Sequence, residues 1–221
     1  MSLFVTATGT EVGKTVTSAV ILARYGKSLD LAYWKPIATG AIDDRDTNEI
    51  KRLCGNLVDV LEESYLFEPP VSPHLAAKLA RTSISPERIL EHLVAHALQD
   101  KERNIVIEGI GGLLVPVTNS GYLVSHLAQD LHLPCLVVAD SGLGTINHTL
   151  LTLEAVRSRD IELVGVVLNG PRNRENRRAI ERFGEVKIIG EIEPIRPLTR
   201  KGVLRAAQRF DRRALLKKYL I

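Results

Sequence analysis

The sequence predicts an α/β fold in which a doubly wound, mainly parallel sheet carries helices on both faces. Short apolar runs, many of them β-branched, alternate with longer segments of helical periodicity, which is the order of βα units. Most of these runs are apolar at consecutive positions, as in strands buried on both sides. The 221 residues are 45% apolar, which is enough to build a core on each side of one sheet. We therefore expect one domain over residues 1–221.

The expected elements follow one another in a regular order along the chain. Strands are expected at Leu3–Thr6, Leu31–Trp34, Ile105–Ile107, Cys135–Ala139, Leu163–Leu168 and Lys187–Ile192. Helices are expected at Lys14–Tyr25, Thr47–Leu53, Pro86–Asp100, Thr145–Arg159 and Arg174–Phe183, with a short one near His74 to Ala80. Ligands of such sheets gather beyond the carboxyl ends of the strands, so the residues that follow each strand form the candidate site.

Charge and cysteine content exclude several classes of protein. The 29 Lys/Arg and 26 Asp/Glu leave a net charge of +3, too small to indicate nucleic acid as the main ligand. Residues 196–221 hold nine Lys/Arg and one Asp, which predicts a solvated basic face on a C-terminal helix. Two cysteines are too few for a disulfide framework. With no basic leader and no apolar stretch of ~18 residues, the chain is expected to be cytoplasmic and free of membrane spans.

A phosphate-binding loop is expected directly after the first strand, in Ala7-Thr8-Gly9-Thr10-Glu11-Val12-Gly13-Lys14-Thr15. Gly13 lets backbone amides approach phosphate oxygens, Lys14 neutralises the β- and γ-phosphates, and Thr15 offers a hydroxyl to Mg²⁺. The usual pattern has glycine six residues before the lysine, where this chain has Thr8. The alternative is a surface turn with a chance Gly-Lys-Thr.

The second and third strands each end in a charged residue. Lys35 follows the second strand, and Pro36 after it is expected to halt that strand. Glu108 ends the third strand and is followed by Gly109, Ile110, Gly111 and Gly112. A carboxylate placed after an apolar strand is costly to desolvate unless a cation meets it, and Mg²⁺ is such a cation. The alternatives are a solvated strand end for the lysine and a structural cap for the glutamate.

Asp46 has two interpretations. It precedes Thr47 and Glu49, so it could act as an N-cap with the glutamate reaching back in a capping box. It could also be a ligand of Mg²⁺, and Asp43 and Asp44 are close enough to compete for that role.

The later strands end in less specific loops. Gly142 and Gly144 precede a helix start, which makes a second possible anion site because the first amides of a helix face outward. Asn169-Gly170 and Glu193-Pro194-Ile195 are, by position alone, ordinary loops.

These motifs together resemble the dethiobiotin synthetases, over nearly the whole chain up to about Ile195. Thr10 to Thr15 match the Thr-Glu-Val-Gly-Lys-Thr of that family, and Lys35 to Gly40 match its Lys-Pro-x-x-Ser/Thr-Gly. Glu108 to Gly112 differ from its Glu-Gly-Ala-Gly-Gly only at Ile110, and the segment from Leu143 to Thr152 is similar to its dimer-forming helix. The chain departs from the family at two positions: Ala7 stands where the family has glycine, and Gly9 stands where the family has aspartate.

The resemblance implies a homodimeric P-loop ligase that uses ATP and Mg²⁺ to convert 7,8-diaminopelargonate and CO₂ or bicarbonate to dethiobiotin. The implied catalytic residues are Lys35, Lys14, Thr10 and Glu11. The implied metal ligands are Thr15, Asp46 and Glu108. The implied substrate contacts are Lys35, Thr39 and, across the subunit boundary, Gly144, Thr145, Ile146 and Asn147. The implied nucleotide contacts are Glu11, Val12, Gly13, Lys14, Thr15, Val16, Asp46, Glu108, Gly109, Ile110, Gly111, Asn169, Gly170, Glu193, Pro194 and Ile195.

Three other functions remain open on the sequence. One is a cobyrinate-type amidase, which normally carries a glutaminase domain that this chain has no room for. Another is a ParA-like nucleotide switch that binds DNA or a partner through the basic tail, although its usual second lysine is missing from Thr8, Gly9 and Thr10. A third is a degenerate nucleotide-binding module, which the departures at Ala7 and Gly9 keep possible.

Overall fold

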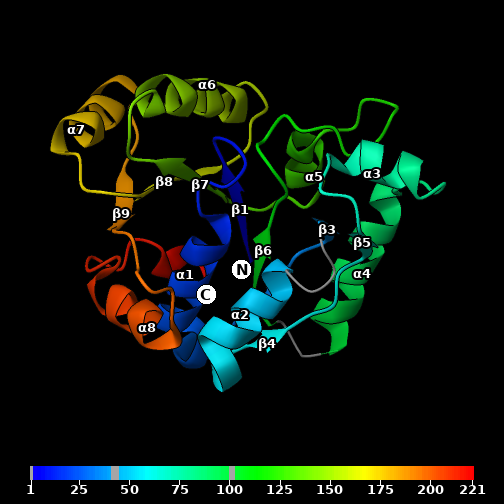
Figure 1. Ribbon diagram of the computed structural model, residues 1–221, viewed down its shortest axis with the longest axis horizontal. Helices are drawn as coiled ribbons and strands as arrows, with labels where there is room; N and C mark the ends of the chain where they lie inside the picture. The colour runs from blue at the N-terminus through cyan, green and yellow to red at the C-terminus, as the bar shows by residue number, and fades with distance from the viewer. Residues whose placement is uncertain (1, 41–44, 100–102) are drawn as a thin grey trace.

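The computed structural model describes residues 2–40, 45–99 and 103–221, and its centre is a seven-stranded sheet in the order β4-β2-β6-β1-β7-β8-β9 (Figure 1). Every neighbouring pair of strands in this sheet is parallel. The strands are β1 (Leu3–Ala7), β2 (Ala32–Trp34), β4 (Asp59–Val60), β6 (Ile105–Glu108), β7 (Cys135–Asp140), β8 (Leu163–Asn169) and β9 (Ile188–Ile192). The predicted α/β class with a parallel sheet is confirmed.

Helices cover both faces of this sheet, as the buried runs predict (Figure 1). They are α1 (Lys14–Leu29), α2 (Asp46–Cys54), α3 (Pro73–Leu79), α4 (Pro86–Gln99), α5 (Val124–Asp130), α6 (Thr145–Arg157), α7 (Arg174–Phe183) and α8 (Arg200–Arg209). Short 3₁₀ turns follow at Gly55–Leu57 and Lys217–Tyr219. Buried side chains of α1, α2 and α8 share one core, and those of α3 to α7 share the other.

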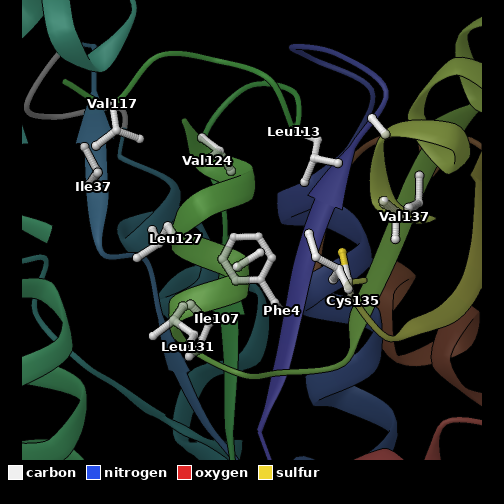
Figure 2. Close-up of a cluster of buried hydrophobic side chains, with 14 of the residues drawn as sticks. Phe4, Ile37, Ile107, Leu113, Val117, Val124, Leu127, Leu131, Cys135 and Val137 are labelled. Carbon is white, nitrogen blue, oxygen red and sulfur yellow. The ribbon is translucent and has the colours of Figure 1, made fainter. Parts of the chain in front are cut away.

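The pleat of β1 shows how one strand serves both cores. Leu3 and Val5 point toward α1, α2 and α8, whereas Phe4 points to the opposite core, where it lies near Ile107 and Leu127 (Figure 2). Alternate residues of a strand face opposite sides of the sheet, so both sets must be apolar when helices cover both faces.

Several short elements escape the sequence patterns. β3 (Ile37–Thr39) and β5 (Tyr65–Phe67) form a separate two-stranded parallel sheet, and β4 has only two residues. Runs of two or three residues are too short to show a period, and α5 has only seven residues. Pro36 does end the second strand as expected, since β2 stops at Trp34. Within the described residues, no helix is both long enough and apolar enough to span a membrane.

Candidate active site

The order of three neighbouring strands brings the lysine of one strand end beside the glutamate of another. β6 lies between β2 and β1, with Trp34 opposite Ile107 and Val5 opposite Glu108. Lys35 therefore emerges next to Glu108, and its Nζ lies 3.0 Å from Glu108 Oε1. Both side chains are buried, at 3% and 1% exposed, so each meets its counter-charge in a region that water does not screen.

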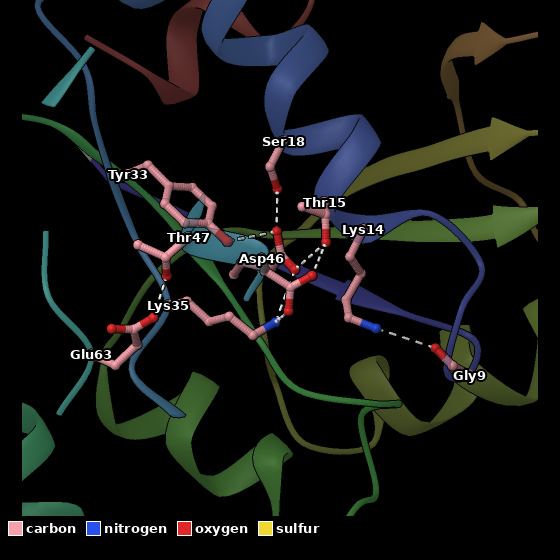
Figure 3. A network of polar contacts seen from close by, with 10 residues as sticks. Gly9, Lys14, Thr15, Ser18, Tyr33, Lys35, Asp46, Thr47 and Glu63 are labelled. Carbon is pink, nitrogen blue, oxygen red and sulfur yellow. Dashed lines mark hydrogen bonds and ion pairs between the residues drawn. The ribbon is translucent and has the colours of Figure 1, made fainter. Parts of the chain in front are cut away.

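Asp46 and Thr15 complete this cluster from two helices (Figure 3). Lys35 Nζ lies 2.6 Å from Asp46 Oδ2. The Thr15 hydroxyl lies 2.6 Å from Asp46 Oδ1 and 2.9 Å from Glu108 Oε1. Four groups from β2, α2, α1 and β6 thus meet at the carboxyl edge of the sheet.

The capping interpretation of Asp46 is wrong. The residue at the N-cap of α2 is Arg45, which has no side-chain capping bond, and Asp46 is the first helical residue. The Glu49 carboxylate pairs with Arg52 instead of reaching back to the helix start. Asp43 and Asp44, the competing metal ligands, lie outside the described residues.

Two residues that the motifs did not indicate hold the other oxygen of Glu108. Ser18 Oγ and Tyr33 OH each donate a hydrogen bond of 3.0 Å to Glu108 Oε2. Ser18 lies one helical turn after Thr15, and Tyr33 lies two residues before Lys35 on the same face of its strand. These spacings were readable in the sequence, but only once the motif residues were placed in a common site.

The charges within the cluster support one another. Burial disfavours the charged form of Lys35, but the Glu108 and Asp46 carboxylates outweigh it and raise the pKa of Lys35. Burial likewise opposes ionisation of Asp46, and the Lys35 ammonium outweighs it and lowers the pKa of Asp46. Burial raises the pKa of Tyr33 well above its ordinary value, with Glu108 adding to the effect, so its hydroxyl remains a donor.

Lys14 lies beside this cluster without joining it (Figure 3). Its Nζ donates to the backbone oxygen of Gly9 over 3.3 Å, so the side chain curls back over the loop that precedes α1. Only 8% of Lys14 is exposed. Burial lowers the pKa of its ammonium group to about 8, because the attraction of Glu108 is weaker than the loss of hydration.

The phosphate loop has the backbone shape that its glycine predicts. Gly13 has φ 93° and caps α1, and Glu11 also has a positive φ, of 59°. Asn169 Nδ2 donates to the carbonyl of Val12 over 3.1 Å. A Cβ on Gly13 would lie 2.0 Å from that same nitrogen, so only glycine fits between the loop and Asn169.

The glycine-rich segment after β6 packs on the start of this loop. A Cβ at Gly112 would lie 3.5 Å from the carbonyl of Ala7 and 3.6 Å from Gly9 Cα. Gly111 has φ 60°, and a Cβ there would lie 3.8 Å from Thr10 Oγ1. Thr10 and the Gly111–Gly112 turn therefore lie together, with Ile110 half-buried against the core.

The predicted substrate residues fall at two other places. Thr39 ends β3, and no hydrogen bond joins its side chain to the lysine–carboxylate cluster in the part of the chain that the structure describes. Gly144, with φ 87°, caps α6 as expected. The Thr145 hydroxyl donates back to the carbonyl of Asp140, and Ile146 packs on the core. Asn147 is exposed, so this turn presents backbone amides and one amide side chain.

The loops after β8 and β9 lie side by side. The amide of Gly170 donates to the carbonyl of Ile192 over 2.9 Å. Glu193 pairs with Arg172 at 3.3 Å, and Pro194 is exposed. Ile195 packs close to Gly202, where a Cβ would lie 2.4 Å from its Cγ2. Asn169, which contacts the phosphate loop, thus lies next to the paired loops.

The amino-acid sequence is similar to curated proteins over most of its length. A family model described as an AAA domain matches residues 1–202. An ATP-dependent dethiobiotin synthetase from Paramagnetospirillum magneticum is 41% identical over 89% of this chain and 90% of its own. One from Rhizorhabdus wittichii is 40% identical over 93% of each chain. The chain belongs to the ATP-dependent dethiobiotin synthetase family.

Solved structures agree on the fold of this dethiobiotin synthetase family member. A ParA family ATPase from Chlorobium tepidum superposes with a TM-score of 0.56 over 99% of this chain and 95% of its own, at 14% identity. The cell division ATPase MinD of Pyrococcus furiosus gives 0.54 over 94% of this chain and 97% of its own, at 17% identity. At such identities the likeness shows a common P-loop fold and nothing about ligands.

Oxygen donors around Thr15 fit the metal that ATP-dependent dethiobiotin synthetases use with their nucleotide. Mg²⁺ is a hard cation that is usually held by one or two carboxylates together with phosphate oxygens and water. Asp46 and Glu108 supply two carboxylates, and the Thr15 hydroxyl lies within hydrogen-bonding distance of both. The donor set present therefore suits this ion better than a soft metal.

Proposed function

We infer that this chain is an ATP-dependent ligase of biotin biosynthesis, which forms dethiobiotin from 7,8-diaminopelargonate and CO₂ with release of ADP and phosphate. The observation that carries this conclusion is the convergence of Lys35, Asp46, Glu108 and Thr15 beside the phosphate loop. The substrate is inferred from the related dethiobiotin synthetases, and the roles of the residues are inferred from the geometry of the cluster.

The proposed reaction needs no nucleophilic side chain, because the substrate amines and the carbamate are the nucleophiles. One amine of the substrate adds CO₂ and loses a proton to give a carbamate. A carbamate oxygen then attacks the γ-phosphorus while the β–γ bridging oxygen leaves with ADP. The second amine then attacks the carbamoyl carbon, loses a proton and expels phosphate, which closes the five-membered ureido ring. The protein must hold the reactants in place and offset negative charge, as in other phosphoryl transfers.

Lys35 and Lys14 are proposed to supply that charge. The Lys35 ammonium is held in place by two carboxylates at 2.6 and 3.0 Å, and we assign it to the carbamate and the transferring phosphoryl group. Lys14 is assigned to the β- and γ-phosphates, with Thr10 and Glu11 on the same loop surface. Thr15, Asp46 and Glu108 would hold Mg²⁺, which adds positive charge at the phosphates when it is bound.

The remaining assignments concern the two ends of the site. Asn169, Gly170 and the loop from Glu193 to Ile195 are proposed to contact the nucleotide base. Backbone amides from Gly144 to Asn147 are proposed to bind the substrate carboxylate, because the first amides of a helix lack intrahelical partners and attract anions.

A homodimer is part of this proposal. The α6 region exposes two large apolar side chains, Leu143 fully and Leu151 at 57%, which a second copy of the chain would cover. Such a dimer would bring the α6 start of one subunit to the phosphate site of the other, so that each substrate is held by both copies.

The test is direct. Purified protein incubated with 7,8-diaminopelargonate, bicarbonate, Mg²⁺ and ATP should produce dethiobiotin, detected by mass spectrometry, with one phosphate released per ring. The Lys35→Ala variant should lose at least about a hundredfold in turnover while keeping its fold and most of its nucleotide affinity. Lys27→Ala, which removes an exposed lysine from the far end of α1, is the matched control.

Near-normal turnover by Lys35→Ala would remove the role assigned to that residue. The rival functions predict other results. A degenerate nucleotide-binding module would release no phosphate with all four components present. A ParA-like switch would bind DNA with a strong dependence on salt and make no dethiobiotin.

A further inference from the structure

A hollow lies at the edge of the sheet, apart from the proposed catalytic residues. It is formed by β9, α8 and residues 209–215, which lie together at one side of the molecule (Figure 1), and its volume is about 850 Å³. We call it the edge cleft. No residue of the phosphate loop from Thr10 to Val16 lines it, nor do Lys35, Asp46 or Glu108.

The edge cleft is strongly positive. Eight of its lining residues are Lys or Arg, and three are Asp or Glu. The acidic side chains are engaged within the protein: Glu191 pairs with Arg177 at 2.7 Å and Glu193 with Arg172 at 3.3 Å. Asp211 is buried and accepts a hydrogen bond of 2.7 Å from the Tyr25 hydroxyl. Little negative charge remains to balance the others.

Six cations of the edge cleft have no ion-pair partner among the described residues. They are Arg196, Lys201, Arg205, Arg209, Arg212 and Arg213, and all six are exposed. Like charges gathered around one hollow repel one another and focus a positive potential into it. A simple solvated helix face would spread its charges over a convex surface, whereas these line a concavity.

The shape and charge of the edge cleft favour a small, multiply charged anion. Its volume falls within the range of about 300–1,000 Å³ that is usual for small-ligand sites. Guanidinium groups are planar donors that bind phosphate and carboxylate oxygens in pairs, and five of the six cations are arginines. A nucleic acid would instead call for a stripe of charge along an extended surface.

We propose that the edge cleft binds a small polyanion carrying two or more phosphate groups, at a site separate from the phosphate loop. Glu193, Pro194 and Ile195 line the cleft and also belong to the loop proposed to contact the nucleotide base. Occupancy of the cleft therefore acts on a loop of the ATP site, and by linkage ATP alters the affinity of the cleft by the same factor.

The test uses inorganic tripolyphosphate as the probe and isothermal titration calorimetry as the readout. The protein is first saturated with Mg²⁺ and a non-hydrolysable ATP analogue, so that the phosphate loop is filled. Wild type should then bind one equivalent of tripolyphosphate, more weakly as salt is raised. The triple variant Arg205→Gln/Arg209→Gln/Arg212→Gln should bind at least about tenfold more weakly.

The matched control removes the same charge from the same segment, outside the edge cleft. Arg200→Gln/Lys217→Gln/Lys218→Gln changes three exposed cations that do not line it, and should weaken binding less than about twofold. Equal losses in the two variants would reduce the effect to net charge and overturn the proposal. So would the absence of binding by wild type, or binding of RNA or an acidic peptide without tripolyphosphate.

Formation of dethiobiotin is measured separately on the same variants. Without tripolyphosphate, the triple variant and its control should form dethiobiotin at the wild-type rate, because none of the substituted residues is assigned to the catalytic site, so either proposal can fail while the other stands.

Discussion

At the scale of single residues, Glu108 accepts more hydrogen bonds than any other described residue of the proposed catalytic site. Its Oε1 accepts hydrogen bonds from Thr15 and Lys35, and its Oε2 accepts hydrogen bonds from Ser18 and Tyr33. The two oxygens therefore have separate tasks. One faces the lysine and the hydroxyl of the phosphate loop, while the other is fixed from behind by two neutral donors.

Tyr33→Phe tests that division, because it removes one donor with little change of volume. Glu108 would then be less firmly oriented, and the Mg²⁺ concentration for half-maximal activity should rise about threefold to tenfold, with a smaller change in kcat. Ser18→Ala should act in the same direction. Tyr219→Phe is the control, since no hydrogen bond joins that hydroxyl to a described residue. Equal metal dependence in all three variants would contradict the assignment.

The lowered pKa of Lys14 predicts how stability depends on pH. Its pKa falls from 10.5 in the unfolded chain to about 8 in the fold, so between these values the unfolded chain binds more protons. Stability contributed by this residue therefore rises with pH across that window, and the burial cost is largest below about pH 8. Lys14→Met should be more stable than wild type at neutral pH, and its advantage in urea unfolding should shrink as the pH approaches 10.5.

At the scale of elements, the phosphate loop is fixed by a strand end from the other half of the sheet. Asn169, at the end of β8, binds the carbonyl of Val12 and lies against Gly13. The loop is thus shaped from outside by an amide side chain as well as by its own glycine. Departures from the usual glycine pattern at Ala7 and Thr8 leave this contact untouched.

Gly13→Ala should disrupt the loop, since the new Cβ would lie 2.0 Å from Asn169 Nδ2 at a φ of +93°. We expect ATP affinity, measured with a fluorescent analogue, to fall more than about tenfold. Gly121→Ala controls for backbone strain in general, because Gly121 has φ +91°, lies outside the phosphate loop, and a Cβ added there would meet no heavy atom within 4 Å. A comparable loss of affinity in that variant would trace the effect to general destabilisation and not to the collision with Asn169.

At the scale of the whole molecule, the two faces of the sheet differ in what they leave exposed. α1, α2 and α8 enclose one core, and α8 borders the edge cleft. On the opposite face, Leu143, just before α6, and Leu151, within α6, are exposed. We assign these two surfaces, as proposals, to different partners: the apolar one to a second subunit and the basic hollow to an anion.

Leu151→Glu should shift the protein from dimer to monomer in sedimentation velocity, because a buried carboxylate without a partner opposes association. Turnover should fall with it, since the proposed substrate site is completed by the second subunit. Leu204→Glu, on α8 at the opposite face, should leave the sedimentation coefficient unchanged. A Leu151→Glu protein that still sediments as a dimer would place the interface elsewhere.

The sequence by itself determined the parallel sheet and most of the motif residues. Strands buried on both faces must be apolar at consecutive positions, so β1, β6, β7 and β8 were readable. Gly13, Lys14 and Thr15 lie in one short run, Lys35 directly follows a strand, and Glu108 ends one. These are local signals, and they need no knowledge of neighbours.

Tertiary structure alone decided which of these residues meet. The placement of β6 between β2 and β1 brings Lys35 to Glu108, although they are far apart in the chain. The tertiary structure also shows that Asp46 is a partner of Lys35 and not a helix cap. Ser18 and Tyr33 belong to the site because both bind Glu108. The reason is physical: strand order fixes which strand ends are adjacent, and chain order does not specify strand order.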